Sequence, residues 1–307
     1  MDHRKPIEDI LRNLSPEQPV LIAGPTASGK SSLALAIAAR QGGVVVNADA
    51  LQVFANWQIL TARPSPDEEA AAPHALYGHV AGDVEYSVGE WLRDVRPFLR
   101  GAVRPIIVGG TGLYFSGLTE GLADIPPTDS TIRAEALRRT ENRETASMLS
   151  ELDAETIARI DTQNPMRVQR AWEVQKTTGR GIAWWQDQTP PPDLGLSESF
   201  PILLDADRDW LGQRIERRFD AMMSLGALEE ARRNLATWAP GAPSSKAIGA
   251  PELIAHLRGE LDLDDAISAA KIATRQYAKR QRTWFRSRMK FWHRFTLPED
   301  DFAMMSS

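Results

Sequence analysis

The segment with the most definite chemistry is a short glycine-bounded run near the start of the chain. Its residues are Gly24, Pro25, Thr26, Ala27, Ser28, Gly29, Lys30 and Ser31, which satisfy the pattern G-x-x-x-x-G-K-[ST]. In such a run the backbone curls so that N–H groups point at phosphate oxygens, and a following helix presents its N-terminus to the same charge. Lys30 adds a positive charge, and the Ser31 hydroxyl suits a Mg²⁺ ion shared with the phosphates. The run therefore predicts a phosphate-binding loop.

Two other segments carry useful groups directly after apolar runs. Asp49 ends the second apolar run, and its carboxylate could accept a proton from a nucleophile or a hydrogen bond from an amine. A turn or helix cap is the plainer interpretation of Asp49. Residues 109–112, Gly-Gly-Thr-Gly, follow the next apolar run and could form a tight loop that a ligand approaches closely. An ordinary structural turn is the alternative for that loop.

A pair of arginines could serve the same phosphate site. Arg214 and Arg218 are four residues apart on a helix expected from Trp210 to Leu225, so they share one face of it. They could steady a departing phosphate as a charged clamp. The alternative is that they form surface pairs, which contribute little, with Glu216, Asp220 or Glu229.

A phosphate-binding loop does not name a reaction, because ATPases, small-molecule kinases and other users of diphosphates share it. An ATP hydrolase normally adds a strand-end Asp or Glu as a second Mg²⁺ ligand. Asp205, after the apolar run 202–204, is the best candidate for that ligand. An ordinary strand-end carboxylate is at least as good an interpretation of this residue.

The last part of the chain is strongly basic. Between residues 266 and 297 there is no Asp or Glu, and the cations are Lys271, Arg275, Lys279, Arg280, Arg282, Arg286, Arg288, Lys290 and Arg294. The spacing of 275, 279, 282, 286 and 290 places these cations along one stripe of a helix. Tyr277, Trp284, Phe285 and Trp292 interleave with them and could pack in a core or stack on bases. Contact with nucleic acid is favoured over a helix that only covers acidic neighbours.

The elements that position these groups form an alternating pattern. Continuous apolar runs at 19–23, 43–49, 104–108 and 201–205 predict strands buried on both faces, and the run 31–40 predicts a helix. This alternation indicates an α/β fold with a P-loop NTPase-like parallel sheet flanked by helices. Residues 118–200 are charged and helical in pattern, which predicts an insertion between two core parts, 1–117 and 201–307.

Composition limits the class of protein. The 307 residues carry a formal net charge of −5, so the average surface does not attract nucleic acid, and any basic partner site is local. The chain has no Cys, which excludes disulfides, thiolate zinc sites and Cys nucleophiles. No apolar run is long enough for a signal peptide or a membrane span, so a cytoplasmic enzyme without membrane contact is expected. We expect a monomer, although the sequence does not determine the oligomeric state.

Together these segments resemble one family, the tRNA dimethylallyltransferases, also called isopentenyl-diphosphate:tRNA isopentenyltransferases. Besides the loop 24–31, the matching segments are 47–54 (N-A-D-S-x-Q-V-Y in the family), 108–114 (G-G-T-G-L-Y), 167–171 (R-V-x-R-A), 246–253 (I-G-Y-K-E-L) and 274–285 (T-R-x-Y-A-K-R-Q-x-T-W-F). The motifs extend from about residue 20 to residue 286, which is nearly the whole chain. The chain departs from the family at Ala50 (usually Ser), Gln58 (Asp), Met166 (Gln) and Ala250-Pro251 (Tyr-Lys).

The resemblance implies transfer of a prenyl group. The loop 24–31 would hold the diphosphate of dimethylallyl diphosphate, with Mg²⁺ on Ser31. The acceptor would be the exocyclic amine of the adenosine just 3′ of the anticodon, turned out of its stack. Asp49 would be the catalytic carboxylate that takes the amine proton, and Thr111 would lie beside the reacting centre. Arg214 and Arg218 would steady the departing pyrophosphate.

The resemblance also implies where the tRNA anticodon stem-loop binds. The implied contacts are Asp49, Ala50, Leu51, Gln52, Thr111, Arg133, Met166, Arg167, Val168, Gln169 and Arg170. The basic helix adds Arg275, Lys279 and Arg282, so helix and insertion would hold the RNA mainly through phosphates. Two other functions stay open: a small-molecule kinase that uses ATP, and a non-catalytic tRNA-binding protein whose phosphate loop only stabilises the fold.

Overall fold

Parallel strands form one central sheet in the computed structural model, which describes residue 10 and residues 12–296. The strands are β1 (Val20–Ala23), β2 (Val44–Asn47), β3 (His74–Ala75), β4 (Pro105–Gly109), β5 (Phe200–Asp205) and β6 (His293–Thr296). Their order across the sheet is β3-β2-β4-β1-β5-β6, and every neighbouring pair is parallel. The α/β fold with a parallel sheet is therefore confirmed, and each of the four predicted runs contains a strand.

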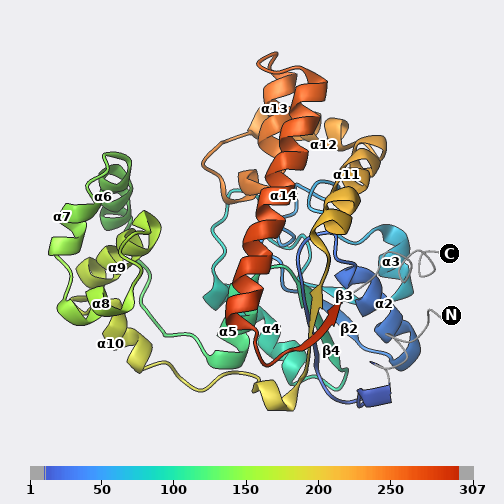
Figure 1. The fold of residues 1–307 in the computed structure, drawn as a ribbon, viewed down its shortest axis with the longest axis horizontal. Coiled ribbons are helices and arrows are strands. Elements are labelled where there is room, and N and C mark those ends of the chain that lie inside the picture. Colours follow the sequence, from blue (N-terminus) through green and yellow to red (C-terminus); the bar gives the residue numbers. More distant parts are fainter. Residues whose placement is uncertain (1–9, 11, 297–307) are drawn as a thin grey trace. The chain divides into compact units, whose positions relative to one another are not determined.

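Helices cover both faces of this sheet (Figure 1). On one face, α2 (Lys30–Gln41) and α11 (Arg208–Ser224) pack side chains such as Leu33 and Ile215 against alternate strand residues. On the other face lie α4 (Val88–Leu99) and α5 (Gly112–Glu120), where the rings of Trp91 and Tyr114 stack with centroids 4.6 Å apart. Because both faces are covered, the strands are continuous apolar runs.

A second core lies beside the sheet and involves three further helices of the same unit. These are α12 (Ala227–Asn234), α13 (Ala250–Leu257) and the long α14 (Leu263–Arg288). The short α3 (Pro66–Ala71) lies next to α2 instead. Buried side chains from α11 to α14, among them Phe219 and Leu253, pack around Trp57. This core supports the loop that follows Trp57, which lines the site described below.

Two strands were not predicted, and one of them corrects the predicted basic helix. The cation stripe 275–290 was expected on one helix, but α14 ends at Arg288, so Lys290 lies beyond it, and the chain then forms β6, which pairs with β5 in parallel. The strand β6 is short, and its residues are mostly exposed, so it lacks the apolar run that identifies the inner strands. Trp292, just before β6, is buried against Phe115 and fixes the end of the chain's basic segment on the sheet.

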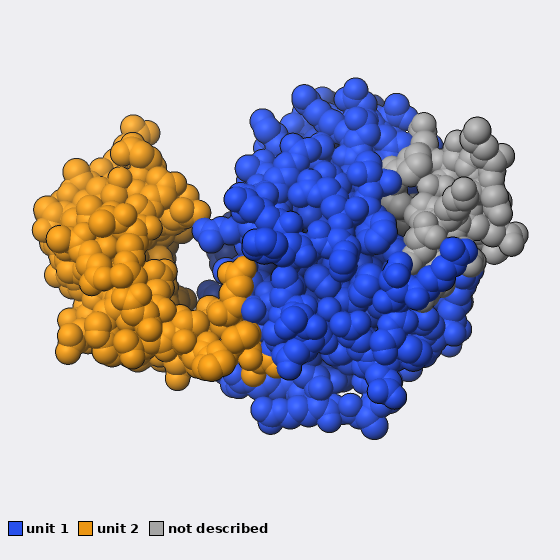
Figure 2. Space-filling model, turned by 60° about the horizontal axis from the view of Figure 1, so that its bottom comes forward, with its two compact units in different colours: residues 1–119, 194–307 blue, residues 120–193 orange. Residues whose placement is uncertain are grey.

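The insertion forms its own compact unit of residues 120–193, shown in orange in Figure 2. Its helices are α6 (Ser130–Glu141), α7 (Thr145–Ser150), α8 (Ala154–Arg159), α9 (Pro165–Thr178) and α10 (Ile182–Asp187). They enclose a core that includes Met148 and Trp172. The unit is shorter than the predicted 118–200, because Leu194 already donates a backbone hydrogen bond to Leu118 O (3.2 Å) in the sheet unit. None of the described helices is both long and apolar enough to cross a bilayer.

One carboxylate stabilises the insertion and yields a first prediction. Glu151 accepts hydrogen bonds from Arg139 Nη2 (2.7 Å) and Trp172 Nε1 (2.8 Å) and pairs with Lys176 Nζ (2.9 Å). These donors, Arg139 first, lower the pKa of Glu151 to about 2. Gln at this position would leave the buried Arg139 with Glu144 (3.3 Å) as its one remaining carboxylate partner, so we expect residues 120–193 to lose about 1 to 2 kcal/mol of stability at pH 7.

The pH dependence follows from the direction of that shift. A depressed Glu pKa contributes stability above the unfolded value of about 4.3, and the contribution is lost as pH falls towards 2. Hydrogen exchange of α7 and α9 amides should therefore be faster in Glu151→Gln than in wild type at pH 7, with the difference shrinking below about pH 4. Glu155→Gln is the control, because its pair with Arg159 is exposed. Equal effects of both variants at pH 7 would contradict this account.

Candidate active site

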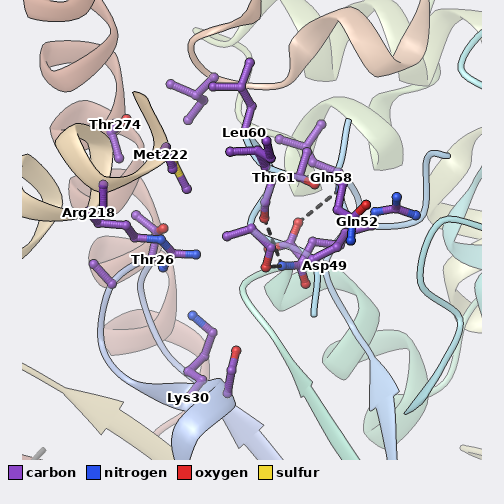
Figure 3. A pocket seen from close by; sticks show the side chains of 18 of the residues that line it. Thr26, Lys30, Asp49, Gln52, Gln58, Leu60, Thr61, Arg218, Met222 and Thr274 are labelled. Atoms are coloured by element: carbon purple, nitrogen blue, oxygen red, sulfur yellow. Dashed lines mark hydrogen bonds between the residues drawn. The ribbon is translucent and has the colours of Figure 1, made fainter. Parts of the chain in front are cut away.

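A cavity of about 710 Å³ opens where the loops after β1, β4 and β2 lie side by side. The three loops are adjacent because β4 lies between β1 and β2 in the sheet. In Figure 3 the side chains of Lys30 and Arg218 point into the cavity across from Asp49. Leu60 and Met222 lie at the end away from Lys30. The cavity thus combines cations, one carboxylate and an apolar end.

The phosphate-binding loop forms one side of the cavity. Thr26, Ala27, Gly29, Lys30 and Ser31 line it, whereas Gly24, Pro25 and Ser28 are buried and do not. Left-handed backbone at Ala27 (φ 62°) and Gly29 (φ 88°) alternates along the loop, which turns successive N–H groups inward. The first amides of α2 also have no acceptor within the helix. The loop therefore has the form expected of an anion-binding nest.

The charge of Lys30 is tuned by its surroundings. Its Nζ donates a hydrogen bond to Pro25 O (2.8 Å). Burial lowers the pKa of Lys30 to about 8, with Arg218 acting in the same direction and Asp49 opposing it. A lysine whose charge is poorly solvated gains most when an anion binds beside it.

Asp49 lies two residues beyond β2 rather than at its end, and hydrogen bonds hold it. Its N–H donates to Asn47 Oδ1 (2.8 Å), and its Oδ1 accepts from the Leu51 N–H (3.0 Å). Oδ1 therefore caps a turn, as the plainer interpretation proposed. Within the described residues Oδ2 accepts no hydrogen bond, and Asp49 lines the cavity. One carboxylate thus has a structural oxygen and an open one.

The glycine turn supports this carboxylate. Thr111 was expected beside the reacting centre, but it does not line the cavity, and its Oγ1 accepts from the Ala50 N–H (2.9 Å). A Cβ on Gly109 would lie 2.0 Å from Ala48 O, and one on Gly110 would lie 2.9 Å from Asp49 Oδ2. The turn therefore needs glycine for close approach, and Thr111 holds the segment that carries Asp49.

Gly109→Ala is accordingly expected to destabilise the sheet unit by about 3 kcal/mol or more, because a backbone carbonyl cannot move aside. Gly212→Ala is the matched control. No atom lies within 4 Å of a Cβ there, and the residue is inside α11, so alanine should stabilise by about 0.5 to 1 kcal/mol. Urea unfolding of the two variants measures both effects. Similar midpoints for Gly109→Ala and wild type would refute the close approach.

The two arginines reach the cavity from α11. Arg214 Nε donates to Ala27 O (2.9 Å), which ties α11 to the phosphate loop, and its guanidinium lies over the Trp210 ring. Burial lowers the pKa of Arg218, and the charge of Asp49 opposes that shift. Both arginines line the cavity rather than pairing at the surface. The expected surface partners bind other cations: Glu216 pairs with Arg275, Asp220 with Lys271 and Glu229 with Arg232.

Asp205 does not belong to this cavity. Its carboxylate faces Arg282 Nε (3.7 Å) and Arg294 Nη1 (3.2 Å). Two interpretations of Asp205 were considered, a second Mg²⁺ ligand and an ordinary strand-end carboxylate. The structure favours the second.

Sequence reasoning missed the opposite wall of the cavity. Glu230 on α12 accepts hydrogen bonds from the N–H groups of Gln58 (2.7 Å), Ile59 (2.9 Å) and Leu60 (3.0 Å). Gln52, for which the resemblance implies a tRNA contact, also lines the cavity, and its Nε2 donates to Thr61 O (2.9 Å) and Ala62 O (2.8 Å). These contacts fix the lining segment 58–63. No pattern in the sequence links positions so far apart.

The predicted tRNA contacts of the insertion separate into two groups. Arg133, Met166 and Arg167 are exposed. Val168 and Gln169 are buried, which corrects the prediction for both side chains, because α9 turns them into the core of the insertion. Gln169 there accepts a hydrogen bond from Thr140 and donates one to Glu173. Arg170 is partly exposed and donates to Thr128 Oγ1 (2.8 Å).

The predicted tRNA contacts on the basic helix also separate into two groups. Arg275 pairs with Glu216, and Arg282 faces Asp205 with only 17% of its side chain exposed. These two cations therefore balance acidic neighbours, as the alternative for this helix proposed. Lys279 is exposed and forms no ion pair within residues 12–296.

Comparisons with protein families and with known relatives lead to the same family that the sequence motifs resemble. The family model described as IPP transferase matches residues 52–288, and one described as isopentenyl transferase matches residues 18–73. A tRNA dimethylallyltransferase of Cereibacter sphaeroides is 60% identical over 95% of this chain and 93% of its own length. A tRNA dimethylallyltransferase of Roseobacter denitrificans is 63% identical over 90% of this chain and 98% of its own length.

Solved structures give the same result. The full-length tRNA isopentenylpyrophosphate transferase of Bacillus halodurans aligns with a TM-score of 0.66 at 31% identity, over 94% of this chain and 92% of that one. A eukaryotic dimethylallyltransferase acting on tRNA aligns with a TM-score of 0.76 at 23% identity, over 94% of this chain and 77% of that one. At this identity the alignment shows that the two proteins share a fold. From its sequence motifs, its cavity and these relatives, the chain belongs to the IPP transferase family, that of the tRNA dimethylallyltransferases.

Proposed function

We propose that this chain transfers the dimethylallyl group of dimethylallyl diphosphate to tRNA, releasing diphosphate. The acceptor is the exocyclic amine of the adenosine 3′-adjacent to the anticodon. The observation that carries the proposal is the single cavity in which a phosphate-binding loop, two arginines and one open carboxylate oxygen face one another beside an apolar end. The motif resemblance and the family support the choice of donor and acceptor.

The residues on the phosphate side of the cavity bind the diphosphate of the donor and stabilise it as the leaving group. The loop amides, Lys30, Arg214 and Arg218 surround the place for the diphosphate. Negative charge grows on the diphosphate as the allylic carbon–oxygen bond breaks, so fixed cations stabilise the transition state more than the ground state. The apolar end with Leu60 and Met222 suits the hydrocarbon of the donor and excludes water from it.

The residues of the loop also suit Mg²⁺. No cluster of three or more His, Cys, Asp or Glu that could enclose a metal occurs among residues 12–296. Mg²⁺ needs no such cluster when phosphates and water supply most of its ligands. Ser31 lines the cavity at the start of α2 and offers one hydroxyl beside the phosphate site. When bound, the ion would offset charge on the diphosphate.

Asp49 receives the proton. The adenosine amine attacks the allylic carbon, a nitrogen–carbon bond forms, and the carbon–oxygen bond to diphosphate breaks with its electron pair leaving on the oxygen. The amine must lose one proton for the product to be neutral, and Asp49 Oδ2 is the open acceptor across from the cations. A base inside a stacked loop cannot reach this cavity, so the adenosine is extruded first.

Exposed cations provide the RNA side of the proposal. Lys279 on α14 and Arg133 and Arg167 in the insertion are exposed and could contact phosphates. Because the substrate is tRNA, we place the reaction in the cytoplasm.

The experiment is transfer of label from radioactive dimethylallyl diphosphate into unmodified tRNA with Mg²⁺. We expect label in tRNA. Less label is expected when the adenosine 3′ of the anticodon is replaced by guanosine, because guanine carries its exocyclic amine at a different ring position. A parallel assay with γ-labelled ATP tests the kinase. Label from ATP in a small molecule, with none from dimethylallyl diphosphate in tRNA, would overturn the proposal. Tight tRNA binding without either transfer would favour the non-catalytic binder.

A further inference from the structure

A buried amide connects the two loops on which the proposed reaction depends. Gln281 lies in the last third of α14, directly after the exposed cations Lys279 and Arg280, yet only 6% of it is exposed. Its Oε1 accepts from the Thr26 N–H (2.9 Å) of the phosphate loop. Its Nε2 donates to Gly110 O (2.9 Å) in the glycine turn. One side chain thus joins segments that are far apart in the chain.

Only a neutral side chain with a donor and an acceptor can make both contacts. The Thr26 N–H can only donate and Gly110 O can only accept, so they fix which end of the amide faces which loop. A carboxylate would offer two acceptors, and an aliphatic side chain would leave the Thr26 N–H and the buried Gly110 O without these partners. The position is therefore chemically specified for an amide.

The glycine turn is shaped around this amide. A Cβ on Gly110 would lie 2.3 Å from Gln281 Nε2 and 2.9 Å from Asp49 Oδ2. Gly110 therefore lies between the amide and the open oxygen of the carboxylate, with no room for a side chain. One turn later on α14, the ring of Trp284 occupies the corresponding space at Gly112, where a Cβ would come within 2.2 Å of it. The same helix thus contacts the turn twice.

We propose that Gln281 is a positioning residue that sets the distance between the phosphate loop and Asp49 for prenyl transfer. This inference rests on the proposed function. The bond to Thr26 holds the loop that grips the leaving group, and the bond to Gly110 holds the turn beside the base. Because the Thr26 N–H is bonded to Gln281, this amide is not one of the loop's donors to phosphate.

A positioning role predicts a loss in the chemical step rather than in RNA binding. Small misplacement of base and leaving group is costly at the transition state, so Gln281→Met should lower kcat by about 10- to 100-fold. The KM for tRNA should change by less than about threefold, since the amide is buried and cannot touch RNA. Gln276→Met, on an exposed position of the same helix, is the matched control and should keep wild-type kcat.

A second variant tests the hydrogen bonds themselves. In Gln281→Glu the introduced carboxylate can accept from Thr26 but repels Gly110 O and Asp49, whereas its protonated form again has one donor and one acceptor. The ratio of its kcat to that of wild type should therefore rise as pH is lowered from about 8 to 6. A ratio independent of pH would show that the protonation state of this side chain, and with it the hydrogen bond to Gly110 O, does not matter for transfer.

The outcomes separate this inference from the proposed function. Transfer by wild type with kcat within about threefold in Gln281→Met, or a flat pH ratio for Gln281→Glu, would overturn the positioning role and leave the function intact. Absence of transfer by wild type would overturn both. If Gln281→Met does not fold by circular dichroism, the pH ratio of Gln281→Glu decides.

Discussion

Asp49→Asn should lower kcat for prenyl transfer by about 10²- to 10⁴-fold, the range that a positioned general base contributes. The amide oxygen of Asn can still accept from the Leu51 N–H, so the turn that Asp49 caps is kept. What is lost is the negative charge and the proton acceptor at Oδ2. Single-turnover transfer at saturating donor and tRNA measures this step without interference from product release.

The control for Asp49→Asn is Asp83→Asn, the same change at an exposed position of the sheet unit. It should leave kcat unchanged. Thermal unfolding of Asp49→Asn should match that of wild type, because no hydrogen bond of the turn is removed. A kcat for Asp49→Asn within about threefold of wild type would exclude the carboxylate as the base.

Lys30→Met should lower kcat/KM for dimethylallyl diphosphate by about 10²- to 10³-fold. The stem volume is kept, but the cation that faces the diphosphate is removed. The stability of the free protein should not fall, because burial disfavours the charge of Lys30 and lowers its pKa to about 8. Binding of inorganic diphosphate with Mg²⁺, measured by calorimetry, should weaken in parallel.

The contrast with tRNA binding makes this second prediction specific. The affinity of Lys30→Met for tRNA alone should equal that of wild type, since Lys30 lies at the cavity wall formed by the phosphate loop. Lys30→Arg, which keeps the charge on a wider head group, should be intermediate. Normal diphosphate binding with weakened tRNA binding would contradict the assignment of the loop.

The parts of the site that could be predicted are those formed by residues that are close together in the sequence. The phosphate loop is a local pattern between a strand and a helix, so its form follows from the sequence alone. The position of Asp49 follows from the parallel sheet, because strand ends gather at one edge. Thr111 could not be placed in this way, since the direction of its hydroxyl depends on where the Ala50 N–H lies.

The parts that could not be predicted depend on distant partners or on which face of a helix is buried. Glu230 holds the segment 58–60 from about 170 residues away, and only the packing of α12 reveals it. Val168 and Gln169 share a motif with exposed Arg167, but the helical turn separates them into core and surface. The strand β6 was missed because an exposed edge strand has no apolar run.

The way the insertion joins the sheet unit gives the protein a modular character. The segments that lead into and out of residues 120–193 meet at the hydrogen bond between Leu194 N–H and Leu118 O, 3.2 Å apart. An inserted unit whose two ends leave from one point can lengthen, shorten or change sequence without altering the sheet's register. Evolution can therefore vary the inserted unit while the loops of the sheet unit that line the cavity stay the same.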